Sequence, residues 1–321
     1  MNLCTIKRNI PFAATAVVAL ILYLAAGFRF HGFMSVGVFK NFFSDNSFLG
    51  IASIGMTFVI LSGGIDLSVG AIVGLSSVII AMMMETHHIS PVLSVVTVLG
   101  VGVVLGTIMG ALIQLFALPP FLVTLAGMFF ARGLGLVLQP ESITINSYDS
   151  LLSHWTLPMP LTALLYLSMF VIALIIAHFT KFGRNVYAIG GNEQSAMLMG
   201  LPVSRTKIGV YAFSGFCSAL AGIVYTLYSP SGYARAADGL ELDAIAAVVI
   251  GGTLLTGGVG FVAGTFIGVL IFGIIQSAII FQGTLSSWWT RIAVGLLLLV
   301  FILLQKLLQL KRFATSKDVS K

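Results

Sequence analysis

Two long stretches without a charged residue constrain this chain more than any other feature. Residues 89–131 and 244–290 contain no Asp, Glu, Lys or Arg, and most of their side chains are apolar. A soluble domain carries about 25% charged residues and needs them on its surface, whereas this chain has 8% charged and 58% apolar residues. A soluble enzyme is therefore excluded, and so is a disordered chain, because disorder requires a polar composition. The surface must face lipid.

The apolar segments predict an all-α polytopic membrane protein, with residues 1–321 forming one transmembrane domain. A helix needs about 20 apolar residues to cross a bilayer. Pro119-Pro120 divides the first uncharged stretch, because proline breaks helical hydrogen bonding, and the glycines between Gly251 and Gly260 divide the second. The ten predicted spans are residues 10–28, 42–62, 67–84, 91–117, 121–138, 161–179, 208–228, 242–255, 259–281 and 288–308.

The distribution of Lys and Arg predicts that both chain ends are cytoplasmic, because these residues concentrate on that side of membrane proteins. With the N-terminus inside, 11 of the 16 Lys and Arg residues fall in cytoplasmic segments. The longest outer loop, residues 139–160, contains none. An even number of spans returns the chain to its starting side, so the span count and the charges agree. Residues 180–207 then form the main cytoplasmic loop.

Glycines recur every four residues in two predicted helices, which places them on one helix face where a neighbouring backbone can approach. This pattern favours helix packing, and a role in motion between helices is the alternative. A weak internal sequence repeat, which we call the internal echo, also relates Gly63 and Gly64 to Gly257 and Gly258, because each pair of matching glycines is separated by the same number of residues. Such repeats occur in transporters with two related halves. The packing glycines are Gly102, Gly106, Gly110, Gly260, Gly264 and Gly268.

A carboxylate lies between two apolar segments, in the stretch that contains Ser62, Gly63, Gly64, Asp66 and Ser68. Asp66 can cap the start of the next helix, where its charge favours the positive end of the helix dipole. The alternative is a broken helix beside the translocation path, because irregular backbone inside a membrane is tolerated where it borders a cavity. Both can hold together.

Arg132 lies inside a predicted span, roughly 20 Å from its cytoplasmic end. A structural partner or snorkelling to the interface is favoured over substrate contact. No phosphate-binding loop and no metal-ligand spacing of histidines occurs, so we expect no catalytic residue, metal site or cofactor in this chain. Charge within the spans is too sparse for an obvious ion relay. A transporter of this kind needs an energising partner or is passive.

A short helix is predicted over residues 193–199 of the cytoplasmic loop. Asn192 is a typical N-cap, and Gly200 is typical of a helix end. The helix contains Met197 and Leu198 and little charge, and exposed apolar surface of this kind favours a partner protein. A helix lying on lipid is the alternative.

Three separated motifs stand out along the chain. They are Gly63-Gly-Ile-Asp-Leu-Ser-Val-Gly70, then Gly183-Arg-Asn-Val-Tyr-Ala-Ile-Gly-Gly-Asn192 with Glu193, Ala196 and Gly200, and last Ala246-Ala-Val-Val-Ile-Gly-Gly-Thr253 with Gly257-Gly-Val-Gly260. Together they resemble the ribose/arabinose-type permeases of bacterial ABC sugar importers. They occur in the family's order, and the similarity covers nearly the whole chain. Within this family the chain looks most similar to a permease subunit of a galactofuranose importer.

The resemblance implies a type II importer permease in the bacterial inner membrane, which moves a monosaccharide by alternating access. It implies a cytoplasmic ATPase that uses ATP and Mg²⁺, and a second permease that is either a homologue or a copy of this chain. It also implies a periplasmic sugar-binding protein, which would largely set the specificity of transport. No nucleic acid partner is implied. Relatives often carry a basic or polar residue near Met197 or Met199, where this chain is apolar. The ATPase contact is assigned to Arg184, Asn192, Glu193, Ala196, Gly200 and Pro202.

Two other functions stay open from the residues alone. One is an ABC permease for a branched-chain amino acid or a nucleoside. The other is a self-sufficient carrier or channel, in which Asp66 or Arg132 would be the coupling or selectivity group.

Overall fold

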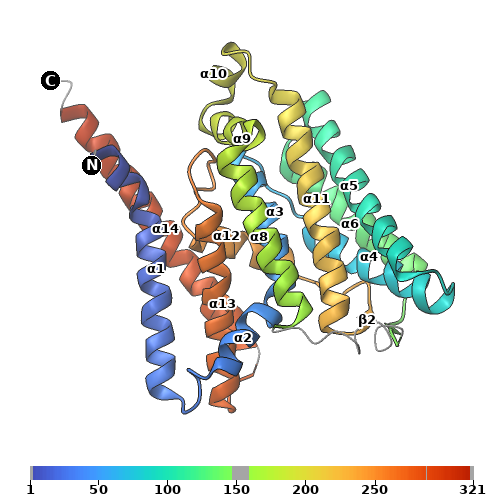
Figure 1. Ribbon diagram of the computed structural model, residues 1–321. Helices are drawn as coiled ribbons and strands as arrows, with labels where there is room; N and C mark the ends of the chain where they lie inside the picture. The colour runs from blue at the N-terminus through green and yellow to red at the C-terminus, as the bar shows by residue number, and fades with distance from the viewer. Residues whose placement is uncertain (1–2, 147–158, 287, 319–321) are drawn as a thin grey trace.

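The computed structural model describes residues 3–146, 159–286 and 288–318, and it folds as a bundle of helices (Figure 1). The predicted all-α membrane architecture is confirmed. The elements are α1 (Leu3–Arg29), α2 (Val36–Asp45), α3 (Ser47–Leu61), α4 (Val69–Ala81), the π-helix η1 (Met82–Thr86), α5 (Pro91–Leu115), α6 (Pro120–Leu138), β1 (Ile143–Thr144), α8 (Leu161–Phe179), α9 (Lys181–Gly191), α10 (Glu193–Leu198), α11 (Val203–Tyr228), β2 (Ser231–Gly232), α12 (Leu240–Ile250), α13 (Val262–Gln282) and α14 (Trp288–Asp318).

Six helices among the described residues are long and apolar enough to cross a membrane, and seven if α2 and α3 count as one bent span. The apolar stretches Ala13–Arg29 and Trp288–Leu303 match the first and last predicted spans. The eighth predicted span, residues 242–255, differs from the structure. Helix α12 has 11 residues, about 16 Å at 1.5 Å per residue, which is too short to cross a bilayer. The total of ten spans stays a prediction.

The second predicted span, residues 42–62, is broken in the structure, where α2 and α3 meet at an angle of 52°. Two side chains at the break bond to the backbone of the preceding turn. The amide of Asn46 donates to the carbonyl of Phe42 at 3.1 Å, and the hydroxyl of Ser47 donates to the carbonyl of Ser44 at 2.6 Å. Such local bonds compete with the helical ladder and bend the chain.

Helices α3 and α4 form the centre of the bundle. Both are apolar around their whole circumference and are buried along nearly their full length, as expected for helices surrounded by protein. Helix α11 packs against α3, α4 and α5. The helices with large exposed apolar side chains include α1, α5, α6, α8 and α14, so these form the surface that lipid would cover.

The two ends of the bundle differ in structure. Strands β1 and β2 pair antiparallel at one end and join the segment after α6 to the segment after α11. Figure 1 shows α9 and α10 at the opposite end, together with both ends of the chain. The predicted outer loop, residues 139–160, contains β1, and its residues 147–158 lie outside the described part. The predicted cytoplasmic loop, residues 180–207, is mostly helical in the structure. It contains α9 and α10, and α11 begins at Val203 and not at residue 208 as predicted.

Candidate functional site

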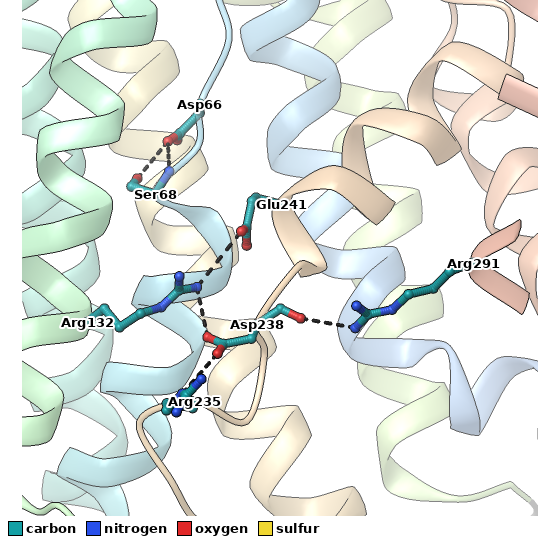
Figure 2. A network of polar contacts seen from close by, with 7 residues as sticks. All are labelled: Asp66, Ser68, Arg132, Arg235, Asp238, Glu241 and Arg291. Atoms are coloured by element: carbon teal, nitrogen blue, oxygen red, sulfur yellow. Dashed lines mark hydrogen bonds and ion pairs between the residues drawn. The ribbon is translucent and has the colours of Figure 1, made fainter. Parts of the chain in front are cut away.

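The break between α3 and α4 holds a fully buried carboxylate. Asp66 Oδ1 accepts hydrogen bonds from the backbone N–H of Ser68 at 2.9 Å and from its hydroxyl at 2.6 Å (Figure 2). Asp66 Oδ2 accepts a third from the hydroxyl of Ser214 on α11 at 2.7 Å. Asp66 thus fixes the backbone just ahead of α4. It is not the predicted cap, because Ser68 occupies the N-cap position and the bonds of Asp66 go to Ser68 and Ser214 and not to an N–H group within α4.

The other predicted path residues surround this break. The hydroxyl of Ser62 donates back to the carbonyl of Val59 at 2.8 Å and so closes the end of α3. Gly63 has a φ of +84°, which lets the chain turn sharply. Ser62, Gly64 and Ser68 are buried, and Gly63 is exposed. Whether these residues border the path of a solute stays a prediction.

An ion-pair cluster lies beside the start of α12 (Figure 2). Arg132 on α6 contacts the carboxylate of Asp238 at 3.0 Å and that of Glu241 at 3.8 Å. Arg235 contacts the second oxygen of Asp238 at 3.2 Å, and the guanidinium of Arg291 donates to the backbone carbonyl of Asp238 at 3.4 Å. The favoured interpretation of Arg132, a structural partner, agrees with this geometry.

The acidic partners Asp238 and Glu241 were not among the candidates from the sequence. Both flank the start of an apolar run at Leu240, and they are three residues apart, so they lie near one another once a helix begins there. A signal was therefore present: an intramembrane arginine requires counter-charges, and these two carboxylates stand next to a predicted span.

Five of the six predicted packing glycines lie at helix crossings. A Cβ at Gly102 would stand 2.5 Å from the carbonyl of Gly215 on α11, and one at Gly110 would stand 2.9 Å from Ile208 Cα. Gly106 faces the carbonyl of Tyr211, also on α11. On α13, Gly264 and Gly268 face the carbonyls of Gly251 and Ala247. The prediction is wrong for Gly260, which lies before α13 begins at Val262 and faces the side chain of Thr253.

The segment expected to contact an ATPase forms α9 and α10. The side chain of Asn192 accepts from the N–H of Ser195 at 2.8 Å and caps α10. Glu193 pairs with Lys207 on α11 at 2.7 Å. Ala196 is buried in a small cluster with Ile189 and Val203. These contacts hold α10 against its two neighbouring helices.

The tip of α10 exposes three consecutive apolar side chains. Met197 is 62% exposed, Leu198 89% and Met199 69%. Gly200, with a φ of +77°, ends the helix, and Pro202 precedes α11. Arg184 is exposed on α9. An apolar tip fixed at its base is suited to enter a groove in another protein.

Three backbones cross where α9 meets the interior of the bundle, and we call this crossing the glycine junction (Leu61, Gly63, Gly190, Gly257 and Gly258). The N–H of Gly258 donates to the carbonyl of Leu61 at 2.9 Å. A Cβ at Gly190 would collide with that carbonyl and stand 2.5 Å from the nitrogen of Gly258. A Cβ at Gly257 would stand 2.8 Å from the nitrogen of Gly63. Two glycines matched by the internal echo, Gly63 and Gly257, therefore touch.

Comparison with known proteins finds related sequences along nearly the whole chain. The family described as branched-chain amino acid transport system, permease component, matches residues 38–302. The inner membrane ABC transporter permease protein YjfF of Escherichia coli is 50% identical over 308 residues, covering 94% of this chain and 93% of that protein. The ribose import permease protein RbsC of Bacillus subtilis is 42% identical over 262 residues (80% and 81%). The fructose import permease protein FruG of Bifidobacterium longum is 36% identical over 313 residues (94% and 92%). No solved structure matches at a significant level.

Proposed function

Because the chain belongs to the family of branched-chain amino acid transport system permease components, we propose that it is the membrane-spanning subunit of an ATP-driven ABC importer for a monosaccharide. It is a multi-pass protein of the inner membrane and a transport subunit, not an enzyme. The observation that carries the proposal is the exposed apolar tip of α10, which is fixed at its base and lies at one end of the bundle. A self-contained carrier has no need of such a tip.

The energising partner is a cytoplasmic ATPase that binds α10. Met197, Leu198 and Met199 supply apolar contact area, and Arg184 adds a positive charge on the adjacent helix. ATP and Mg²⁺ are used by that partner and not by this chain.

The glycine junction supports alternating access as the transport mechanism. It joins α9, the helix next to α10, to the breaks between α3 and α4 and between α12 and α13. Backbone packed directly on backbone cannot deform gradually, so a displacement of α9 must move both breaks. Closure of the ATPase on ATP would push α10, and the two breaks would rearrange around the path of the sugar.

A neutral sugar is the proposed cargo, because two of the relatives are named for the import of ribose and fructose. Both sugars form five-membered furanose rings, as does galactofuranose, the cargo suggested by the finer resemblance. A second permease, either a homologue or a copy of this chain, completes the pathway, and a periplasmic binding protein delivers the sugar. The family's description names branched-chain amino acids, so an amino acid is the competing cargo.

A co-purification experiment tests the coupling site. Met197→Ser with Leu198→Ser removes the exposed apolar surface of α10 but leaves the Asn192 cap and the Glu193–Lys207 pair in place. We expect wild type to co-purify with ATPase activity and this variant to lose most of it. Val36→Ser is the matched control, because Val36 is 72% exposed at the opposite end of the bundle.

Two outcomes would contradict the proposal. Equal ATPase retention by the α10 variant and the Val36→Ser control would show that α10 is not the contact. Sugar uptake by the purified chain into liposomes without ATP would favour a self-sufficient carrier, and Asp66 and Arg132 would then be the residues to test.

A further inference from the structure

A cavity of about 310 Å³, lined by both polar and apolar side chains, lies between six helices, in the half of the bundle away from α10. Its walls come from the α2–α3 break, the end of α11, the start of α12, the later part of α13 and the start of α14. Its size is near the lower end of the range of about 300–1,000 Å³ for small-molecule sites. The polar lining residues are Asp45, Asn46, Tyr228, Asp243, Gln276, Thr290 and Arg291.

Several of these polar groups have hydrogen-bonding capacity to spare. Within the described ranges, no protein group donates a hydrogen bond to the carboxylate of Asp45 or to that of Asp243, and the amide of Gln276 makes none. Asn46 is 4% exposed and donates from Nδ2 to the carbonyl of Phe42 at 3.1 Å. Arg291 donates one hydrogen bond to the carbonyl of Asp238. A guanidinium has five N–H donors, so others remain for a ligand.

The arrangement of donors and acceptors around the cavity identifies the chemical class of ligand. The carboxylates and amides come from α2, the α2–α3 break, α12 and α13, so they suit a ligand that carries several separate polar groups. A branched-chain amino acid concentrates its polar groups at one end. Two carboxylates face one guanidinium, which disfavours an anion such as a sugar phosphate.

Apolar side chains in the cavity wall also fit a sugar. Phe48 and Phe272 line the same cavity, and a sugar ring presents C–H groups that pack against aromatic side chains while its hydroxyls reach the polar groups. We infer that this cavity is a monosaccharide-binding site within the permease, where sugar rests after it leaves the delivering protein. This inference rests on the proposed function and deepens it, because sugar selection would then not belong to the binding protein alone.

The site must also release its ligand, and the structure agrees with weak binding. Three of its lining residues, Gln276, Tyr228 and Arg291, are exposed. A site that conducts must hold its substrate loosely enough for it to leave. We therefore expect binding at millimolar sugar concentrations, well below the affinity typical of a receptor.

Equilibrium dialysis of the purified full-length chain in lipid nanodiscs tests the inference. The probes are D-ribose, D-fructose and D-galactose, with L-leucine and D-ribose 5-phosphate as comparators. We expect at least one neutral sugar to bind more tightly than both comparators. Preferential binding of L-leucine or of the phosphate, or no binding of any sugar, would overturn the proposal.

Substitutions locate the binding in this cavity. Asp45→Asn preserves shape and removes a charged acceptor, which should weaken sugar binding about tenfold. Gln276→Leu should weaken it several-fold. Gln282→Leu is the matched control, because Gln282 is on the same helix but does not line the cavity. If all three variants bind like wild type, the sugar binds elsewhere and the inference is wrong.

The readout separates this inference from the proposed function. Dialysis needs neither ATP nor the ATPase, so sugar binding can be lost in Gln276→Leu while ATPase co-purification is unchanged. Conversely, loss of ATPase co-purification in the α10 variant leaves the dialysis result intact. In whole-cell uptake, Gln276→Leu should raise the KM for the sugar several-fold more than it lowers the maximal rate.

Discussion

At the scale of single residues, the membrane interior of this protein is organised by a few charges that satisfy one another. Arg132 stands between Asp238 and Glu241, and its side chain is 22% exposed. The side chain of Glu241 is only 9% exposed. A buried charge without its partner is strongly destabilising, so the cluster ties α6 to the start of α12 whether or not it meets the sugar.

We predict that Arg132→Gln lowers the free energy of unfolding by up to about 3 kcal/mol, the lower end for a buried pair, because Arg132 is partly exposed. Adding Glu241→Gln should restore much of the loss, since the buried unpaired carboxylate is then gone. The midpoint of thermal unfolding in detergent measures the stability of the single and of the double variant.

Arg235→Gln is the control for this prediction. Arg235 also contacts Asp238, but its side chain is 60% exposed, so its loss should change stability by only about 0–1 kcal/mol. Equal destabilisation by Arg132→Gln and Arg235→Gln would show that burial does not govern the cluster.

At the scale of elements, the glycine junction joins the helix next to α10 to two interrupted helices. The sequence predicted the short helix after Asn192 and the break at Gly63-Gly64, and it related Gly63 to Gly257 only by a weak echo. The contact among Gly63, Gly190 and Gly257 could not be predicted, because it depends on how α9 folds back against the end of α3. The spacing of residues along a chain does not specify which distant backbones cross.

We predict that Gly190→Ala lowers transport about tenfold while the ATPase still co-purifies. Overpacking a core costs about 1–3 kcal/mol, and a penalty of that size in one transport state shifts the population of the states about tenfold. ATP-dependent sugar uptake into vesicles that contain the assembled importer measures the effect.

Gly191→Ala is the neighbouring control, because a Cβ there would meet no atom within 4 Å. Size-exclusion profiles of both variants show whether they fold. Normal uptake by a folded Gly190→Ala protein would mean that the junction does not transmit the motion.

At the scale of the whole molecule, composition was enough to predict a polytopic helical membrane protein, because 8% charged residues cannot cover a soluble surface. The lengths of individual helices were harder to predict from the sequence. Residues 244–255 carry no charged side chain, yet the helix ends at Ile250, because Gly251 and Gly252 turn the chain against α13. The cavity needed the three-dimensional structure, because it combines residues from elements far apart in sequence, whereas the partners of Arg132 left a signal next to a predicted span.

We predict that α10 faces the cytoplasm and the turn before α5 faces outward, as the distribution of Lys and Arg requires. Ser90 and Ser195 are both exposed, and Cys217 is buried. With the other native cysteine, Cys4, replaced by serine, a membrane-impermeant thiol reagent should label Ser90→Cys in intact cells and Ser195→Cys only after permeabilisation. The reverse pattern would contradict the orientation.

The nearly complete burial of α3 and α4 has a consequence for how the protein responds to its bilayer. Changes in bilayer thickness act on helices that contact lipid, which tilt or shift to reduce the mismatch. Here those helices include α1, α5, α6, α8 and α14, while the segment that carries Asp66 is shielded by protein. Hydrophobic mismatch is therefore absorbed at the periphery, and lipid composition can reach the central break only through the packing of the outer helices.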